Sequence, residues 1–495
     1  MKYTSTRDSK KLFSASEAIV KGISEDGGLI VPVEFPQIKL DYINSLAEMD
    51  YPERAADILS MYMDEFTKEE LLDFAQKAYS RFDGDPCPVV KIDDTLFVME
   101  LWHGPTCAFK DMALTLMPYL LVASKRKLGH TDKTLILVAT SGDTGKAALS
   151  GFQDVEGTEI IVFYPSQGVS DMQKLQMITQ EGKNVHVAGI KGNFDDAQTA
   201  VKEIFNDKTA IDTLAKLNIT MSSANSINLG RLLPQVVYYF SAYTDMVSSG
   251  EIELGDKINF DVPTGNFGDI LAGYYAHRMG LPVNKLIIAS NQNNILSDFF
   301  HTGVYDVHRE FYKSMSPSMD ILISSNLERY LYELLGKDST KVAKIFKDLK
   351  QNGEFKLEID LNKIGENIFE AGWADEEETK EIIGEFFEEN DYIMDPHTAV
   401  AARVYVDYVD ETEDETKTVI LSTASPYKFP KDVYAAIGGL EKDNYKCMSK
   451  IQFQTGLPCP ESLYYLRDKE IRHTTVIEKD ETLKAVMKFV SAIKE

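Results

Sequence analysis

Short β-branched runs alternate with amphipathic segments through the middle of the chain. Such runs predict strands, whereas apolar residues spaced three or four apart predict helices. The predicted strands cover residues 135–139, 159–163, 185–188, 219–222, 258–262, 286–289 and 418–421. The predicted helices cover residues 146–152, 171–181, 195–205, 229–243, 270–279 and 481–494. This alternation is typical of βαβ units, so the sequence predicts an α/β fold with open parallel sheets.

The first 92 residues follow a different pattern. Residues 53–81 have helical spacing, and the rest of this region consists of short helical runs separated by glycine and proline turns. The turn-rich stretch 83–86, Asp-Gly-Asp-Pro, marks its end. We therefore predict a helical N-terminal region over 1–92, a smaller α/β domain over 93–250 and a larger α/β domain over 251–495.

Composition and charge narrow the class of protein. The 495 residues, of which 44% are apolar and 26% charged, fit a globular protein of about three domains. The 52 basic and 78 acidic residues give a net charge of −26, which disfavours nucleic acid and anionic membranes as partners. Acidic stretches at 375–390 and 407–415 are interpreted as a solvated helix face and a loop.

The sequence shows no clear signal peptide, membrane helix or cysteine pattern. The N-terminus has no apolar core behind its charged residues, and no apolar run approaches the ~18 residues of a membrane helix. Four cysteines without a Cys-x-x-Cys pair predict neither a disulfide framework nor a zinc site. We therefore expect a reduced, cytoplasmic, multidomain protein.

Candidate chemistry lies where predicted strands meet helices, because ligands of open parallel sheets collect there. Residues 140–145, Thr-Ser-Gly-Asp-Thr-Gly, form the first such junction, and their glycines and helix dipole suit an anion. The segment is not a Walker loop, since Ala147 stands where a hydroxyl would hold magnesium. A plain turn with Ser and Thr caps would give the same pattern.

A second junction covers residues 263–269. Gly265 and Gly268 bracket a segment whose N–H groups could cradle a phosphate. Because a carboxylate beside a phosphate is repulsive, we expect Asp269 to turn its side chain onto the first amides of the following helix as a cap. Two anion cradles imply either two anions or one ligand with two ends.

Two further junctions supply cations. Lys110 follows Phe109 before a predicted helix, and an ammonium held against apolar walls loses solvation, so its pKa falls and its amine becomes nucleophilic. Asn225, Ser226 and Arg231 could present amide, hydroxyl and guanidinium groups to one carboxylate or phosphate. A surface lysine, and capping with a surface arginine, are the alternatives.

Five blocks follow one another along the chain: FKD at 109–111, TSGDTGKAA at 140–148, SANSIN at 223–228 with Arg231, PTGNFGDILAGYYA at 263–276 and STASPYKF at 422–429. Their order resembles the threonine synthase family in its longer form. The segments YTSTR at 3–7, EDGGLIVP at 25–32 and DPHTAV at 395–400 extend the resemblance over residues 3–430.

The resemblance implies the tryptophan-synthase-β fold type, with open parallel three-layer sheets and a mainly helical N-terminal segment. It also implies pyridoxal 5'-phosphate as cofactor and the conversion of O-phospho-L-homoserine and water to L-threonine and phosphate. Lys110 matches the lysine that binds the cofactor as an imine. Thr423 matches the hydroxyl partner of the pyridine nitrogen. The matching cofactor-phosphate residues are Gly265, Asn266, Phe267, Gly268 and Asp269.

The substrate residues implied by the resemblance are Thr140, Ser141, Thr144, Asn225, Ser226 and Arg231. Asp143 stands where many relatives have Asn, so its role is left open, as are those of His103, His186, His277 and His397. The resemblance names a small-molecule substrate and no obligate protein partner, which is compatible with a monomer.

Other members of the same fold type are alternatives: a serine or threonine dehydratase, a cysteine synthase, or a phospho-lyase that stops at the keto acid. A non-catalytic module that binds a phosphometabolite is a more remote alternative. The 223–231 block and the long N-terminal region favour phosphohomoserine, because the substrate phosphate needs a site of its own.

Overall fold

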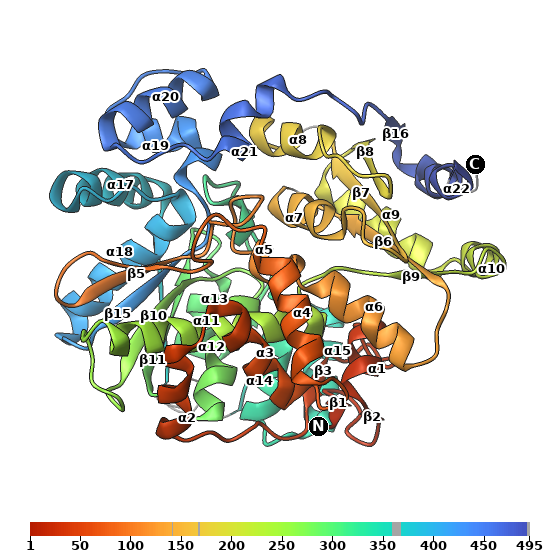
Figure 1. Cartoon of the computed structure of the whole chain (residues 1–495), viewed down its shortest axis with the longest axis horizontal. Helices are drawn as coiled ribbons and strands as arrows, with labels where there is room; N and C mark the ends of the chain where they lie inside the picture. Colours follow the sequence, from red (N-terminus) through yellow and green to blue (C-terminus); the bar gives the residue numbers. More distant parts are fainter. Residues whose placement is uncertain (141, 167–168, 359–367, 493–495) are drawn as a thin grey trace.

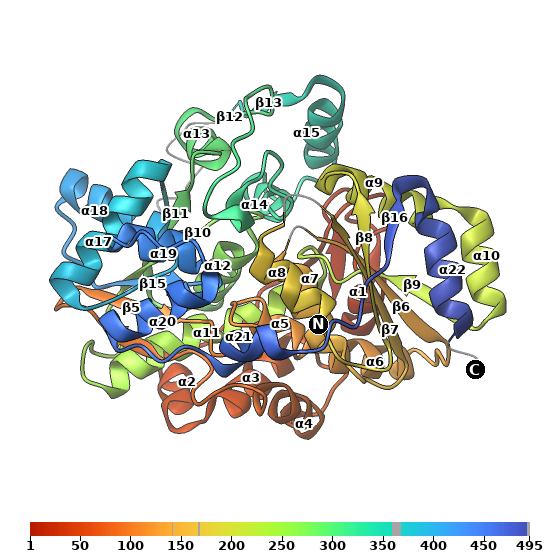
Figure 2. The same ribbon diagram turned by 90° about the horizontal axis from the view of Figure 1, so that it is seen from above.

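Two parallel β-sheets, each covered by helices on both faces, occupy the two halves of the molecule (Figures 1 and 2). The computed structural model describes residues 1–140, 142–166, 169–358 and 368–492. Among these residues no helix is long and apolar enough to span a bilayer. The α/β class with parallel sheets, predicted from the alternating pattern, is confirmed.

The first sheet has six strands and carries the C-terminal half of the fold. Its order is β14 (Phe369–Trp373), β11 (Val283–Ser290), β10 (Ile258–Pro263), β15 (Thr418–Ser422), β5 (Leu96–Glu100) and β4 (Val89–Lys91). All neighbours are parallel except β4 and β5. Successive residues face opposite sides, so Phe97 joins one core cluster and Val98 another.

Helices bury both faces of this sheet. The cluster containing Phe97 packs against α11 (Leu229–Ser248) and α12 (Gly268–Met279). The cluster containing Val98 packs against α17 (Glu376–Asn390), α18 (Pro396–Thr412), α19 (Pro430–Ala436) and α20 (Asn444–Thr455). Strands buried on both faces explain the nearly continuous apolar runs in the sequence.

The second sheet has five parallel strands. Its order is β16 (Val476–Glu478), β8 (Val185–Lys191), β7 (Thr158–Pro165), β6 (Lys133–Ala139) and β9 (Ile219–Ser222). One face packs on α7 (Asp143–Phe152) and α8 (Asp171–Ile178), and the other on α9 (Phe194–Asn206), α10 (Lys208–Lys216) and α22 (Thr482–Ala492). The predicted strands and helices of both sheets are present, with ends shifted by a few residues.

The sheets mix distant parts of the chain. Strand β5, from the predicted smaller domain, pairs with β15, whereas β16, from the predicted larger domain, pairs with β8. The alternation of strands and helices in the sequence does not predict these two strand pairings. Which strands become neighbours is decided by the three-dimensional path of the chain and not by its local pattern. The three domain boundaries stay a prediction.

The N-terminal region is mainly helical but also contains strands. Strands β2 (Leu12–Phe13), β1 (Tyr3–Ser5) and β3 (Ile30–Pro32) form an antiparallel sheet. The predicted helix over 53–81 is two helices, α3 (Tyr51–Tyr62) and α4 (Lys68–Tyr79). The predicted helix is interrupted before Thr67, which is the N-cap of α4. The Thr67 side chain accepts a hydrogen bond from the Glu70 amide and forms a capping box that starts the second helix.

The remaining elements are short. They are α1 (Ala15–Lys21), α2 (Leu40–Ser45), η1 (Leu46–Glu48), α5 (Asp111–Leu114), α6 (Met117–Lys127), α13 (Ile295–Thr302), the antiparallel pair β12 (Val304–Asp306) and β13 (Glu354–Lys356), η2 (Pro317–Met319), α14 (Leu327–Leu334), α15 (Ser339–Asn352), η3 (Pro426–Lys428), α21 (Glu461–Tyr464), η4 (Tyr465–Asp468) and η5 (Lys479–Glu481). The chain enters η2 between β12 and β13.

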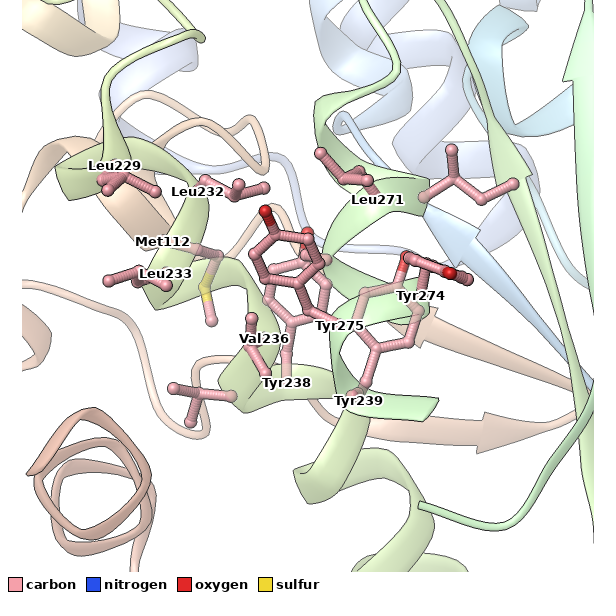
Figure 3. Packing of buried hydrophobic residues seen from close by; sticks show 14 of the residues in the cluster. Met112, Leu229, Leu232, Leu233, Val236, Tyr238, Tyr239, Leu271, Tyr274 and Tyr275 are labelled. Carbon is pink, nitrogen blue, oxygen red and sulfur yellow. The ribbon is translucent and has the colours of Figure 1, made fainter. Parts of the chain in front are cut away.

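Four tyrosines join α11 to α12 in the centre of the molecule (Figure 3). Tyr238 and Tyr239 come from α11 and Tyr274 and Tyr275 from α12, and all four are at most 1% exposed. Rings of this size bury large apolar areas and hold the two helices in a fixed orientation. The starts of both helices, where the second and fourth predicted junctions lie, are therefore positioned relative to each other.

We predict that Gly151→Ala destabilises the fold. An added Cβ would lie 2.0 Å from the Leu114 carbonyl oxygen of α5, a backbone atom that cannot move aside alone. Overpacking of this kind costs about 1–3 kcal/mol, and it would push α7 away from the helix that follows Lys110. The measurement is the midpoint of thermal unfolding.

Gly230→Ala is the matched control. Its added Cβ would meet only side-chain atoms, the nearest being Asn228 Oδ1 at 3.3 Å. Equal midpoints for the two variants would contradict the close approach of α5 and α7.

Candidate active site

Lys110 lies in a loop that is hydrogen-bonded to the end of strand β15. The Leu101 amide donates to the Ser422 carbonyl at 2.9 Å, and the Phe109 amide donates to the Thr423 carbonyl at 2.8 Å. The Ser425 amide in turn donates to the Cys107 carbonyl at 3.1 Å. Because β5 and β15 are parallel neighbours, their carboxyl ends open to the same edge, and Lys110 comes to lie beside Thr423.

The Lys110 side chain is buried against an aromatic ring. It is 9% exposed, and its Nζ lies 4.4 Å from the centroid of the Phe109 ring and donates to Ser318 Oγ at 3.4 Å. The pKa of Lys110 is lowered to about 8, mainly by burial, with Lys428 and Arg231 contributing and Asp143 opposing them. The lowered pKa agrees with the prediction for a lysine between apolar walls.

The 265–269 segment turns sharply into helix α12. Phe267 adopts a left-handed conformation with φ +59° and is the N-cap of the helix. A side chain at Gly265 would lie 2.8 Å from the Ser318 carbonyl oxygen, so this position has room only for glycine. The first amides of α12 lack intrahelical acceptors, so this segment can cradle a phosphate, as the sequence predicts.

Asp269 does not cap α12, contrary to the expectation from the sequence. Its Oδ1 accepts hydrogen bonds from the hydroxyl groups of Tyr238 at 2.5 Å and Tyr239 at 3.0 Å. Burial raises the pKa of the Asp269 carboxyl to about 6, against the effect of these two hydrogen bonds. The tyrosine pair on α11 holds the carboxyl group away from the amides, which leaves them open to an anion.

The first junction is shaped by Thr140. Its Oγ1 accepts hydrogen bonds from the amides of Gly142 and Gly145, each at 3.0 Å, so this hydroxyl holds the loop together. Thr144 is half-buried at the start of α7. Ser141 lies outside the described residues.

Asp143 forms a buried ion pair within this loop. Its Oδ1 lies 2.7 Å from Lys428 Nζ, and Gln173 Nε2 donates to it at 2.8 Å. Although burial alone would raise the pKa of the Asp143 carboxyl, Lys428 and Lys110 hold it well below its usual range. The charge of Asp143 is therefore neutralised locally, and the loop can still accept an anionic ligand.

Arg231 is a buried guanidinium without a carboxylate among the described residues. It is 3% exposed, its Nη1 donates to the Ala224 carbonyl at 3.0 Å, and its Nε has no partner within the described part of the chain. Burial lowers the pKa of Arg231 to about 10. A buried cation of this kind needs a counter-charge, so an anionic ligand fits here.

The fourth junction contacts the phosphate cradle through Asn326. Asn326 Nδ2 lies 3.0 Å from the Asn266 carbonyl and 3.4 Å from Ser226 Oγ, donating to both. Asn225 is exposed beside them. The segments 223–228 and 263–269, which are distant in sequence, thus form one wall of the site. Arg329 stabilises this wall by donating hydrogen bonds to Asn326 Oδ1 and to the Ile227 carbonyl.

Ser318 and His397 belong to the site but were not predicted as site residues. Ser318 accepts from Lys110, and its amide donates to His397 Nε2 at 3.1 Å. His397 Nδ1 lies 2.6 Å from Asp395 Oδ2, which fixes a tautomer with the proton on Nδ1. The 395–400 block was the available signal, but only the fold brings η2 between it and Lys110.

The structure brings the predicted residues together except where noted above. Lys110 lies between the 265–269 segment, Thr423, the Thr140 loop and Arg231. The buried cations of the site are Lys110, Arg231 and Lys428. Of its two buried carboxyl groups, Asp143 pairs with Lys428 and Asp269 accepts hydrogen bonds from tyrosines. The fit to pyridoxal phosphate rests on the glycine-only approach at Gly265 and on two buried cations, Lys110 and Arg231, that have no carboxylate partner among the described residues. Arg231 Nε has no partner there at all. One amine and two anion cradles can serve imine chemistry on a substrate with two anionic ends.

Three family models match consecutive parts of the chain. The model described as Threonine synthase N terminus matches residues 2–79, and Pyridoxal-phosphate dependent enzyme matches residues 86–424. The model described as Threonine synthase, C-terminal matches residues 398–490.

Individual relatives cover most of the chain. Threonine synthase of Schizosaccharomyces pombe is 37% identical over 473 residues, which are 90% of this chain and 90% of that protein. Threonine synthase-like 1 of Homo sapiens is 41% identical over 87% of this chain. The chain spans only 58% of the length of that human protein.

Solved structures agree with this picture. A PLP-bound threonine synthase from Brucella melitensis is 37% identical, with a TM-score of 0.87 over 99% of this chain and 98% of that one. Threonine synthase from yeast is 33% identical, with a TM-score of 0.89 over 99% of both chains. Since sequence and fold agree over nearly the whole length, the resemblance seen in the motifs is confirmed, and the chain belongs to the threonine synthase family of pyridoxal-phosphate-dependent enzymes.

Proposed function

We propose that this protein is a threonine synthase that converts O-phospho-L-homoserine and water to L-threonine and phosphate. The observation that carries the proposal is the position of the buried Lys110 amine between a phosphate cradle and the unpaired Arg231 guanidinium. Family membership and nearly full-length similarity to threonine synthases support it. A cytoplasmic location and covalent attachment of the cofactor through Lys110 are parts of the same proposal.

Pyridoxal phosphate, when bound, supplies the electron sink that makes a Cα–H bond acidic enough to break. Lys110 would hold its aldehyde, the amides of residues 265–269 its phosphate, and Thr423 its pyridine nitrogen. A neutral hydroxyl opposite that nitrogen does not fully protonate the ring, which moderates the sink. We infer that this favours loss of the second proton, from Cβ.

Each end of the substrate has a place in this arrangement. The Thr140 loop would bind the α-carboxylate through its amides and the hydroxyl of Thr144, and we include Ser141 in this role. Arg231, with Asn225 and Ser226, would bind the departing phosphate, where a charge-assisted hydrogen bond contributes roughly 1.5–3 kcal/mol. Binding both ends fixes Cα and Cβ beside one amine.

Lys110 then moves the protons. Its amine takes a proton from Cα and one from Cβ, and phosphate leaves Cγ. The amine then returns one proton to Cγ, which becomes the methyl group, and one to Cα, while water supplies the hydroxyl at Cβ. General acid–base catalysis of this kind contributes roughly 10²–10⁴-fold. The hydroxyl of Ser318, held in place through His397, positions the amine whenever it is free.

A product assay tests the function. We expect the purified holoenzyme to release phosphate and L-threonine from O-phospho-L-homoserine in equal amounts, because water adds after phosphate leaves. Lys110→Ala should abolish turnover and the visible absorbance of the bound cofactor together. Phosphate with a keto acid in place of threonine would indicate a phospho-lyase, and retained colour in Lys110→Ala after dialysis would contradict the role of Lys110.

Arg231→Ala should weaken the use of phosphohomoserine at least about tenfold in kcat/KM, because one charge-assisted contact to the phosphate is lost. The cofactor should stay bound, since its own phosphate rests on residues 265–269. Arg231→Lys keeps a positive charge but not the planar guanidinium. Its kcat/KM should therefore lie between those of the unsubstituted protein and Arg231→Ala. Unchanged turnover and KM in Arg231→Ala would show that another group holds the phosphate.

The pH dependence of cofactor capture by the apoprotein should report the lowered pKa of Lys110. Only the neutral amine attacks an aldehyde, so a pKa of about 8 leaves about one amine in ten reactive at pH 7. The rate, followed by absorbance, should therefore rise with pH and level off above about 8. A free lysine side chain, with its pKa of about 10.4, is the reference, and a rate that still climbs beyond pH 9.5 would refute a shifted Lys110.

A further inference from the structure

A second cavity, of about 180 Å³, lies outside the site described above. It is formed where the residues after α4, one side of α7, the end of α8 and the segment 462–469 meet. Figure 1 draws α7 and α8 in the upper half of the molecule, and η4, within the segment 462–469, contacts α8. A water molecule needs only about 10–15 Å³ of such space, so the cavity has room for a polyatomic ion together with water.

The cavity is lined by three cations, Arg81, Lys146 and Lys469, and by one acid, Glu181. Arg81 and Lys146 are half-buried, whereas Lys469 and Glu181 are exposed at its rim. Among the described residues none of these cations forms an ion pair with a carboxylate. Arg81 donates to the carbonyl and hydroxyl oxygens of Ser150 at 3.0 and 2.8 Å, and Lys146 donates to the amide oxygen of Gln180. In a chain of net charge −26, three cations and a single acid around one cavity give it a net positive charge, which suits an anionic ligand.

The ammonium of Lys146 is destabilised in this cavity. Burial and, after it, the positive charges of Lys469, Lys428 and Arg81 together lower the pKa of Lys146 to about 7, with Asp111 opposing them. An ammonium group gains stability from an anion placed near it, so a ligand of negative charge would relieve the repulsion among the cations.

A neutral amide completes the lining. Gln176 is 2% exposed, and its Oε1 is buried with no partner among the described residues. A hydroxyl of a protonated phosphate, or a water bound with the anion, would satisfy this acceptor. The chemistry of the lining is therefore that of a site for a small oxyanion.

We propose that this cavity binds a small tetrahedral oxyanion, such as a phosphate group, at a site separate from the one proposed for the substrate phosphate at Arg231. The site does not depend on the proposed reaction. Pro105, from the loop that leads to Lys110, also lines the cavity, and the next residue, Thr106, is held by Asp111 and Lys428. An anion there would join α7, α8 and the 462–469 segment to the loop that carries Lys110.

Sulfate is the first probe, because it keeps its charge across the neutral pH range. Binding is measured by calorimetry on the Arg231→Ala holoenzyme, which lacks the proposed substrate-phosphate contact. We expect saturable binding that weakens at least about tenfold in Lys469→Gln and further when Arg81→Gln is added, because each change removes one charge. Lys183→Gln, an exposed lysine next to α8 that does not line the cavity, is the matched control and should bind as before.

Inorganic phosphate and O-phosphoserine identify the source of the anion. Equal affinity for the two favours a free ion, whereas tighter binding of the ester favours a phosphorylated metabolite, and both results support the site. No binding to the Arg231→Ala protein, or equal binding when Lys469 and Arg81 are both replaced, would overturn the proposal.

The pH dependence gives a second readout that a structural role alone would not move. Lys146 has a pKa of about 7 without a ligand, and a bound anion raises it, so binding takes up a proton above pH 7. Sulfate affinity should therefore fall by up to about tenfold for each pH unit above 7. Lys146→Met should bind more weakly and lose this dependence, and an unchanged pH profile in that variant would count against the site.

Discussion

The hydrogen bonds between the loop after β5 and the end of β15 are the constraint on which the rest of the site depends. They hold residues 101–109 against residues 422–425, which are more than 300 positions away in the chain. Lys110 directly follows this contact, and Thr423 is one of its members. Because both strands are parallel neighbours in one sheet, Lys110 and Thr423 lie at the same edge of it.

Charge gives the site its second organising feature. Lys110 and Arg231 are buried cations without a carboxylate partner among the described residues, whereas the nearby acids are occupied, Asp143 by Lys428 and Asp269 by two tyrosines. Buried cations are costly unless an anion joins them, so the protein is built to be completed by anionic ligands. The 180 Å³ cavity beside α7 also has an excess of cations, Arg81, Lys146 and Lys469, over its one lining acid, Glu181.

These two features also separate binding from chemistry. The segments 140–145 and 265–269 could bind anions through backbone amides at glycine turns and helix starts. Such amides accept any phosphate or carboxylate that fits between them. In the proposed mechanism, the proton chemistry depends on the single amine of Lys110, which donates to Ser318, and Ser318 in turn contacts His397. An enzyme of this family can therefore change its substrate through the cradles while the amine stays in place.

The sequence by itself determined the α/β class, the order of the strand–helix units, the four ligand-bearing junctions and the family, because local periodicity and turn chemistry are written in neighbouring residues. It did not reveal that Asp269 bonds to tyrosines instead of capping α12, that Asp143 pairs with Lys428, or that Ser318 contacts both Lys110 and His397. Those facts depend on how helices and loops that are 30 to about 300 residues apart pack against one another. Only the tertiary structure decided them, since contacts between separate elements leave no local pattern in the chain.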